Sequence, residues 1–504
     1  MSQKKQSDAY KVQTEQRSYK YIPSLLEKSI FHDTSLENNK IKSKNITSVP
    51  KEYIRSSIED FPNVSEFEVV RHYTNLSRLN FSIDEGFYPL GSCTMKYNPK
   101  INDWAANLPG FRDIHPYASE KTVQGALELM YLLQESLTHI SGLKACSLHP
   151  AAGAQGELAG VKMIAKYHQE NNQSHKNTVL VPDSAHGTNP ASAALCGLKV
   201  REIKTGSKGY IEYAQVEAAM GDDVAAIMTT VPNTLGIFEK DIVKISQLMH
   251  DNGALVYGDG ANLNALVGKA SFGAMGVDVM HINLHKTFST PHGGGGPGAG
   301  PVVVSDRLKN FLPSPIVNKD PKTGEYCLDY SIPHSVGQYR AFYGNFGMLV
   351  RALCYIYAFG HEYLAKISEY SVLNANYIRK ALEAYFHLPY ETDSLHEVVF
   401  SDQKQRKNND VNTMDIAKRL MDYGYHPPTV YFPLIVDGAL MMEPTESESK
   451  RTLDRYIETM IKIAKECKDN PEVVKSAPHK TGIKRLNETQ AARNPVLTWS
   501  KLNK

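Results

Sequence analysis

The sequence lacks three features that would place it in large classes of protein. Only 6 of its 504 residues are cysteine, and their positions show no paired spacing typical of a disulfide framework or a zinc site. Its 56 basic and 54 acidic residues leave a net charge of +2, so no overall field attracts nucleic acid. No apolar run is long enough to span a bilayer, and the opening residues have no apolar signal core. These absences predict a cytoplasmic protein that binds neither nucleic acid nor membrane.

What the sequence does contain is a lysine at the end of a strand-like apolar run. Lys286 lies in the stretch VDVMHINLHKTFSTPHGGGGPGAGPVVV. At the mouth of an apolar sheet the charged form of a lysine is disfavoured, so its amine can condense with an aldehyde. The glycines between 293 and 300 let backbone approach a ligand closely. A surface lysine before a flexible loop is the alternative, and three upstream features argue against it.

The first feature is Asp259, which ends the strand-like run ALVYGDG. Open α/β sheets build their sites at the carboxyl ends of their strands. A carboxylate there can keep the pyridine nitrogen of pyridoxal phosphate protonated, which makes the ring an electron sink. The alternative is an ordinary Asp-Gly turn.

The other two features are a small-residue helix start and a histidine. In HPAAGAQGELAG a helical pattern follows Ala152, Gly153, Ala154 and Gln155, whose free N–H groups can bind a phosphate. His186, in VLVPDSAHGTNPASA, also follows a strand-like run and can lie over a pyridine ring, or merely cap the next helix. The order of phosphate loop, stacking ring, acid and lysine resembles the fold type I enzymes that use pyridoxal phosphate.

Periodicity predicts an α/β fold with a mostly parallel sheet. Strands are expected at 178–181, 225–231, 254–257, 277–284 and 300–304, with a helix over 241–252 that stops at Gly253. A long helix is expected over 343–368, and the polar stretch 401–410 is expected to be an exposed loop. We predict an N-terminal arm and active-site-bordering segment over 1–119, a large cofactor-binding domain over 120–330, and a linking helix with a small C-terminal α+β domain over 331–504. Residues 1 to about 70 look polar and irregular.

Longer strings narrow the resemblance to one family. These are NFSIDEGFYPLGSCTMKYNPKIND, HPAAGAQGELAG, DSAHGTNPASA, DGANLNA, NLHKTFSTPHGGGGPGAGP, YRAFYGNFGMLVRA, HPPTVYFPLI and MEPTESES. The chain resembles the P-protein of the glycine cleavage system, glycine dehydrogenase (decarboxylating), in its lysine-bearing subunit 2 form. The resemblance implies decarboxylation of glycine with transfer of the aminomethyl group to the lipoyl arm of H-protein. It also implies subunit 1 as a partner in a heterotetramer, with T-protein and L-protein as indirect partners.

Several other residues have open interpretations. His285 and His292 flank the lysine and either shuttle protons, touch phosphate or satisfy loop carbonyls. Cys93, beside Ser92, Thr94 and Lys96, is more consistent with a small buried residue than with a redox thiol. Arg340 suits a substrate carboxylate, although a structural ion pair is the default. Two rival functions stay open: a stand-alone fold type I enzyme, such as a desulfurase or aminotransferase, and a non-catalytic scaffold subunit.

Overall fold

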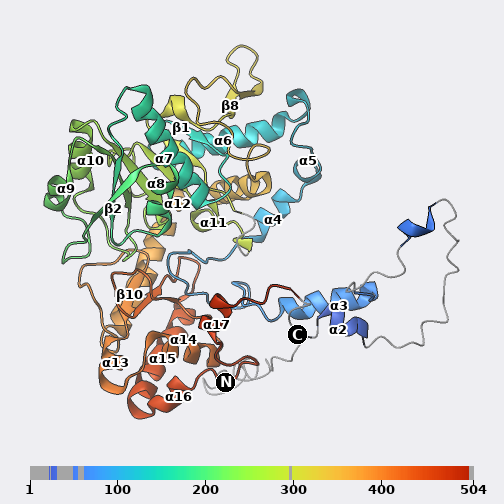
Figure 1. Cartoon of the computed structure of the whole chain (residues 1–504), viewed down its shortest axis with the longest axis vertical. Helices are drawn as coiled ribbons and strands as arrows, with labels where there is room; N and C mark the ends of the chain where they lie inside the picture. Colours follow the sequence, from blue (N-terminus) through green and yellow to red (C-terminus); the bar gives the residue numbers. More distant parts are fainter. Residues whose placement is uncertain (1–21, 23, 31–48, 55–61, 294–297, 499–504) are drawn as a thin grey trace. The chain divides into compact units, whose positions relative to one another are not determined.

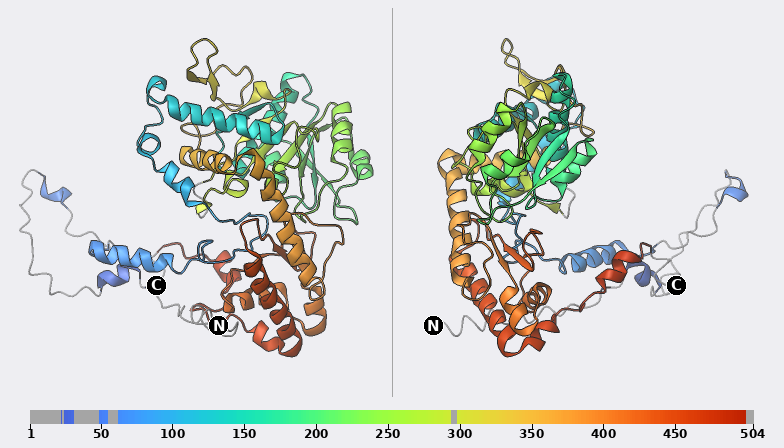
Figure 2. Two further views of the ribbon diagram at one scale, coloured as in Figure 1. Left: turned by 180° about the vertical axis from the view of Figure 1, so that it is seen from behind. Right: turned by 60° about the vertical axis from the view of Figure 1, so that its left-hand side comes forward.

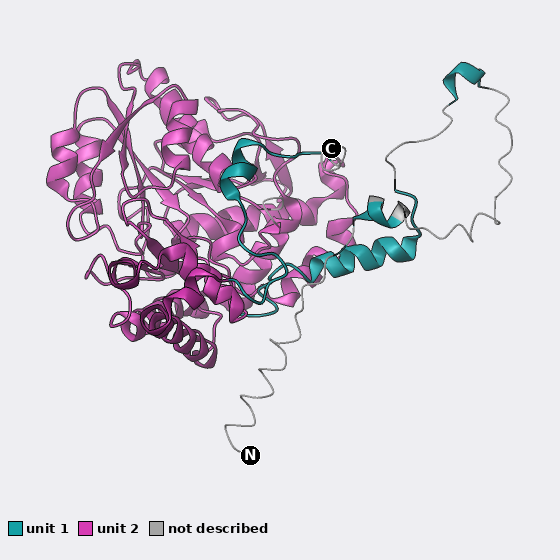
Figure 3. Cartoon of the chain, turned by 60° about the horizontal axis from the view of Figure 1, so that its bottom comes forward, with its two compact units in different colours: residues 1–86, 478–504 teal, residues 87–477 magenta. Residues whose placement is uncertain are grey.

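The computed structural model describes residues 22, 24–30, 49–54, 62–293 and 298–498. The chain divides into two compact units, residues 1–86 with 478–504 and residues 87–477 (Figure 3). Within the described part of the first unit, the α-helices are α2 (Leu25–Ile30), α3 (Glu66–Ser77) and α17 (Glu488–Arg493). Most of the stretch expected to be irregular, residues 1–70, lies outside the described residues.

A seven-stranded sheet forms the centre of the second unit. Its strands are β1 (Ala145–Ser147), β2 (Thr178–Pro182), β3 (Lys199–Ile203), β4 (Val224–Thr230), β5 (Leu255–Gly260), β6 (Val279–Ile282) and β7 (Val302–Val304), in the order β1-β7-β6-β5-β4-β2-β3. Strand β7 runs antiparallel to both neighbours, and the other four pairings are parallel. This confirms the expected mostly parallel sheet. Strands β1 and β3 were not predicted, because β1 is very short and β3 is largely exposed.

Helices cover both faces of this sheet (Figure 1). They include α6 (Gln124–Ser141), α7 (Gly153–Glu170), α8 (Thr188–Leu195), α9 (Tyr213–Ala219) and α10 (Ile242–Asp251). Alternate side chains of β5 enter different cores: Val256 packs in one, and Leu255 and Tyr257 pack in the other. As predicted, α10 stops at Gly253, which adopts the left-handed φ of 67°.

The C-terminal part of the second unit has its own antiparallel sheet and core. Strands β10 (Val398–Ser401), β11 (Thr429–Val430) and β12 (Ala439–Met442) pair in the order β10-β12-β11. Around them lie α13 (Gln403–Asn409), α14 (Thr413–Asp422), α15 (Lys450–Asp469) and α16 (Pro471–Lys475). The expectation of an exposed loop over 401–410 is therefore wrong. Helix α13 is polar but is fixed by tertiary bonds, such as that from Gln405 Nε2 to the carbonyl of Tyr385 at 2.9 Å.

Helix α12 (Phe346–Leu382) joins the two regions of this unit (Figure 2). It begins slightly later than predicted and continues well beyond residue 368, because buried Ser371, Ala375, Ile378 and Leu382 extend its apolar face at helical spacing. Gly360, with φ 62°, breaks the helical geometry within it. The remaining elements of the unit are α4 (Lys100–Ala106), α5 (Pro109–Arg112), α11 (Leu284–Thr287), β8 (Ile316–Lys319) and β9 (Tyr326–Asp329). Among the described residues, no helix is both long and apolar enough to cross a membrane.

Candidate active site

Asp259 lies buried near the carboxyl end of the central strand β5, with 2 % of its surface exposed. Its Oδ1 accepts a hydrogen bond from the N–H of Ala261 at 2.9 Å and lies 3.4 Å from Nε2 of His281 on the neighbouring strand β6. Its Oδ2 accepts from the amide of Asn189 at 3.4 Å. The phenolic oxygen of Tyr257 lies 2.7 Å from Nδ1 of His281, which fixes the imidazole. The carboxylate is thus held in place at a strand end, where an open α/β sheet builds its site.

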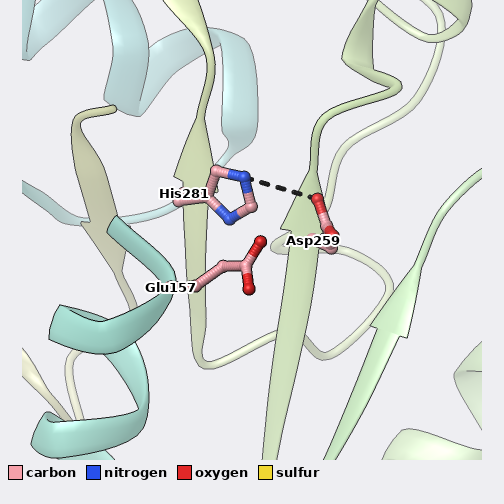
Figure 4. Close-up of side chains that lie close together, drawn as sticks. All are labelled: Glu157, Asp259 and His281. Atoms are coloured by element: carbon pink, nitrogen blue, oxygen red, sulfur yellow. Dashed lines mark ion pairs between the residues drawn. The ribbon is translucent and has the colours of Figure 1, made fainter. Parts of the chain in front are cut away.

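Glu157 joins this group from the first turns of α7, as Figure 4 shows together with Asp259 and His281. Its Oε1 accepts from the hydroxyl of Thr188 at 2.9 Å, and that hydroxyl lies 2.9 Å from Nδ1 of His186. Burial, and to a smaller extent the negative charge of the nearby Asp259, raises the pKa of Glu157 to about 8. No sequence pattern was interpreted as pointing to Glu157, although its place one turn after Gly153 on the predicted phosphate-binding helix was a usable signal.

His186 lies between β2 and α8, and much of its surface is exposed. Its ring packs edge-on against Phe432, with ring centroids 5.7 Å apart. The protein atoms around its ring partly desolvate it, and this lowers the pKa of His186. The nearby Asp259 opposes this effect on the pKa, and Lys286 adds to it. His186 therefore lies within electrostatic reach of both Asp259 and Lys286.

The start of α7 has the geometry of an anion site. Its first helical hydrogen bond is from the N–H of Gly156 to the carbonyl of Ala152 at 2.9 Å, so the amides of Gly153, Ala154 and Gln155 have no intrahelical acceptor. The Gln155 side chain is engaged, since its Oε1 accepts from the N–H of Ala151 at 2.6 Å. At residue 155 the side chain is therefore occupied, and the backbone amide is the group without an intrahelical acceptor.

Two glycines keep this helix start free of side chains. A Cβ on Gly153 would lie 2.7 Å from Nδ2 of Asn283, and a Cβ on Gly300 would lie 2.1 Å from the carbonyl oxygen of Ala152. The segment that directly precedes β7 therefore packs against the backbone of the helix start. This close approach explains why the chain has glycine at both positions.

Lys286 lies in the short helix α11, directly after β6. The rings of His285 and His292 meet edge to face beside it, with centroids 5.2 Å apart, and Nε2 of His292 lies 2.9 Å from the carbonyl oxygen of Cys93. Burial, and to a smaller extent the nearby His292 and Lys286, lowers the pKa of His285 to about 3, which keeps its ring neutral. Most of the glycine loop that follows, residues 294–297, lies outside the described residues.

Buried polar atoms around Lys286 lack partners and so fit a polar ligand. Among the residues that the structure describes, Asn283 Oδ1, His285 Nδ1 and Thr287 Oγ1 have no hydrogen-bond partner. Orphaned buried polar groups are costly, and a ligand's donors and acceptors can satisfy them. Together with the free amides of α7 and the acid on β5, these atoms fit an aldehyde cofactor with a phosphate arm and a ring nitrogen.

Arg340, Lys96 and Cys93 have more clearly structural surroundings. A nitrogen of the Arg340 guanidinium donates to Oδ1 of Asn345 at 2.5 Å, so its partner is an amide and not the expected carboxylate. Lys96 is buried and bonds to Glu446 at 2.8 Å. Burial raises the pKa of the Cys93 thiol, and Lys286 partly offsets this, which agrees with a small, mostly protonated side chain.

Comparisons with known proteins agree with this geometry. The family model of aminotransferase class V matches residues 155–317, and the model of the glycine dehydrogenase C-terminal domain matches residues 367–482. A crystal structure of glycine decarboxylase (P-protein) in inhibitor-bound form superposes with a TM-score of 0.68 at 18 % identity, covering 82 % of this chain and 93 % of that one. A NifS-like protein superposes with a TM-score of 0.58 at 14 % identity, covering 75 % and 99 %. The fold is that of the fold type I pyridoxal-phosphate enzymes.

Curated relatives then narrow the class to a family. A probable glycine dehydrogenase (decarboxylating) subunit 2 from Caldanaerobacter subterraneus subsp. tengcongensis is 55 % identical over 453 residues, which cover 90 % of this chain and 93 % of that one. One from Listeria welshimeri is 54 % identical over 449 residues, covering 89 % and 91 %. The chain belongs to the family of glycine dehydrogenase (decarboxylating) subunit 2.

Proposed function

We propose that this chain carries the pyridoxal-phosphate site of a glycine decarboxylase. In this function glycine loses its carboxylate as CO2, and its aminomethyl group passes to the lipoyl arm of H-protein. The observation that supports this most strongly is the convergence of Lys286, Asp259, His186 and the free amides of α7. The chain that holds them is 54–55 % identical to its curated relatives over 89–90 % of its length. The names of those relatives favour this function over a desulfurase, an aminotransferase or a scaffold.

Pyridoxal phosphate, when bound, supplies the electron sink that receives the pair left by a departing carboxylate. We assign the remaining tasks to side chains and amides of this chain. Lys286 would hold the cofactor through its aldehyde carbon. Asp259, held by His281 and Ala261, keeps a proton on the ring nitrogen. The amides of residues 153–155 bind the phosphate dianion, helped by the positive end of the α7 dipole.

His186 and Glu157 complete the proposed site. His186 would lie against the cofactor ring, and Thr188 links it to Glu157 through contacts of 2.9 Å each. Because its pKa is raised to about 8, Glu157 carries a proton at neutral pH and adds no second negative charge beside Asp259. This leaves the full charge of Asp259 available to the ring nitrogen.

The partners follow from the names of the relatives. Subunit 2 implies a subunit 1, and we propose that the two form the working enzyme, a heterotetramer, with lipoylated H-protein as its co-substrate. T-protein and L-protein would act on the products without touching this chain. A cytoplasmic location stays a prediction from the sequence.

Mass spectrometry of H-protein tests the proposal. The chain, its subunit 1, pyridoxal phosphate and glycine are incubated with lipoylated H-protein, and unlipoylated H-protein serves as the control. We expect only the lipoylated form to gain the mass of one aminomethyl group with reduction of its disulfide. If alanine or cysteine is consumed while glycine is not, the chain is a different enzyme of the same fold.

A further inference from the structure

A second group of buried titratable side chains lies beside the lysine site. His396 and Glu397 directly precede β10, and Glu443 directly follows β12. Because Val398 pairs with Met442 in the antiparallel ladder, Glu397 and Glu443 flank the same end of it. All three residues are fully buried, and Nε2 of His396 lies 3.9 Å from Oε1 of each glutamate.

The two glutamates hold the backbone on either side of Cys93. Oε2 of Glu397 accepts from the N–H of Ser92 at 2.8 Å. The two oxygens of Glu443 accept from the N–H and the hydroxyl of Thr94, at 2.8 and 2.6 Å. Ser92 and Thr94 both adopt left-handed backbone, with φ of 62° and 50°, which side chains rarely occupy without compensating contacts.

This backbone connects the group to Lys286. The carbonyl of Cys93, between the two held residues, lies 2.9 Å from Nε2 of His292 in the lysine loop. The charge of Lys286 also influences His396, Glu397 and Glu443. The group therefore lies within electrostatic reach of the reacting centre, although no sequence motif connects it with that centre.

The hydrogen bonds indicate where a proton resides. Both oxygens of Glu443 accept hydrogen bonds, which favours its ionised form. Glu397 has only one engaged oxygen, and its Oε1 and both nitrogens of His396 have no partner among the described residues. Two neighbouring buried carboxylates do not readily ionise together. Glu397 is therefore the side chain that holds a proton.

The pKa directions agree with this assignment. Burial, followed by the charge of Glu443, raises the pKa of Glu397 well above its ordinary value. Burial also raises the pKa of Glu443, and the nearby Glu446 raises it further. The two hydrogen bonds from Thr94 and the nearby Lys286 lower this pKa and so partly offset the rise. Burial, with Lys286, lowers the pKa of His396 to about 3, so its neutral ring can pass a proton without keeping it.

A metal ion is the alternative to a shared proton, because His396, Glu397 and Glu443 each place a possible ligand atom within 4.8 Å of the other two. Three of the four carboxylate oxygens already accept N–H or O–H groups. A shared proton satisfies the group better than a cation.

The proposed reaction consumes one proton. Loss of CO2 from glycine leaves an electron pair on the methylene carbon, which forms a C–S bond with one sulfur of the lipoyl disulfide. The S–S bond breaks, its electron pair leaves on the other sulfur, and that sulfur must take up one proton to become a thiol. We propose that Glu397 is the acid that supplies this proton, an inference that rests on the proposed function. His396 acts as its relay, and Glu443 positions the Cys93 backbone.

The test uses the complex of this chain with subunit 1, pyridoxal phosphate and lipoylated H-protein. In Glu397→Gln the amide oxygen still accepts from Ser92, but the proton is lost. We expect single-turnover aminomethyl transfer to slow by about 100-fold or more, while the absorbance change on glycine binding keeps its amplitude. The matched control is Glu448→Gln, from the same segment. Burial raises the pKa of that glutamate to about 7, without a contribution from Lys286, and its variant should transfer at the wild-type rate.

The pH profile separates a proton donor from a structural residue. Wild-type transfer should slow as pH rises through the pKa of Glu397, and Glu397→Gln should be insensitive to pH over that range. His396→Asn should also slow transfer and leave glycine binding intact, which provides a second variant should Glu397→Gln fold poorly. Equal rates in Glu397→Gln and wild type would overturn the proposal, as would loss of glycine binding together with transfer. Inactivation of the wild type by a chelator would indicate a metal site instead.

An infrared difference spectrum tests the proton without any turnover. The spectrum of wild type minus Glu397→Gln, recorded on cofactor-free protein at neutral pH, should contain the C=O stretch of a protonated carboxyl group. An ionised carboxylate band in its place would show that Glu397 holds no proton. This readout is independent of the proposed function, whose own failure would appear as a wild-type complex that cannot transfer the aminomethyl group.

Discussion

Replacing Gly300 with alanine should weaken cofactor binding indirectly, because the new side chain would displace the backbone at the start of α7. The new Cβ would lie 2.1 Å from the carbonyl oxygen of Ala152, 2.4 Å from its carbonyl carbon and 2.9 Å from the N–H nitrogen of Gly153. Ordinary van der Waals contact begins at 3.4 Å, so the start of α7 must retreat by about 1.3 Å. All three atoms are backbone, and no side chain can rotate away to relieve the clash.

The expected cost has two parts. Overpacking of this kind destabilises the fold by about 1–3 kcal/mol. Displacing one amide from a phosphate removes a charge-assisted hydrogen bond, about 1.5–3 kcal/mol, which weakens cofactor binding roughly 10- to 150-fold. Gly125→Ala is the control, because its Cβ meets no atom within 4 Å at the exposed start of α6.

Titration of cofactor-free protein with pyridoxal phosphate, followed by absorbance, measures the loss. Denaturant unfolding in the absence of cofactor measures the stability term separately. Wild-type cofactor affinity in Gly300→Ala, with the fold intact, would refute the placement of the phosphate at the start of α7.

Two further predictions concern the acids of the site. Asp259→Asn keeps the shape of the side chain but cannot hold a proton on the ring nitrogen, so glycine decarboxylation should slow by about 100-fold or more. The control is Asp251→Asn at an exposed position, which should leave the rate unchanged. Equal rates in both variants would contradict the role of Asp259. Glu157, with its pKa raised from 4.5 to about 8, keeps a proton in the folded chain that the unfolded chain releases, so its contribution to stability is fully present below about pH 4.5 and is lost as pH rises toward 8. Glu157→Gln should therefore flatten the fall in unfolding free energy between about pH 5 and pH 8, and an unchanged slope by denaturant titration would argue against the raised pKa.

Local sequence patterns predicted the sheet well. Strands β2, β4, β5 and β6 are apolar runs, and Gly253 ends α10 as its position suggested. Helix α13 was missed because its side chains are polar on every face, so its stability comes from contacts with residues far along the chain. The predicted domain boundaries near 120 and 330 stay a prediction.

The candidate site residues that the sequence indicated either follow a strand-like run or begin a helix. Lys286, Asp259 and His186 each follow an apolar run, which the sequence displays directly. His396, Glu397 and Glu443 come from two segments that meet only because β10 and β12 pair. The two glutamates accept hydrogen bonds from Ser92 and Thr94, which lie 305 and 349 residues earlier in the chain. Residue spacing contains no information about such a meeting, so only the fold could reveal it.

Exchange of labelled CO2 with the carboxyl carbon of glycine tests the central claim most directly. It is measured with this chain alone, with subunit 1, and with subunit 1 plus lipoylated H-protein, beside Lys286→Ala in the same complex. We predict exchange that requires the complete mixture and disappears in Lys286→Ala. Exchange that survives in the variant, or a cofactor-loaded wild-type complex that shows none in any mixture, would contradict glycine decarboxylation at Lys286.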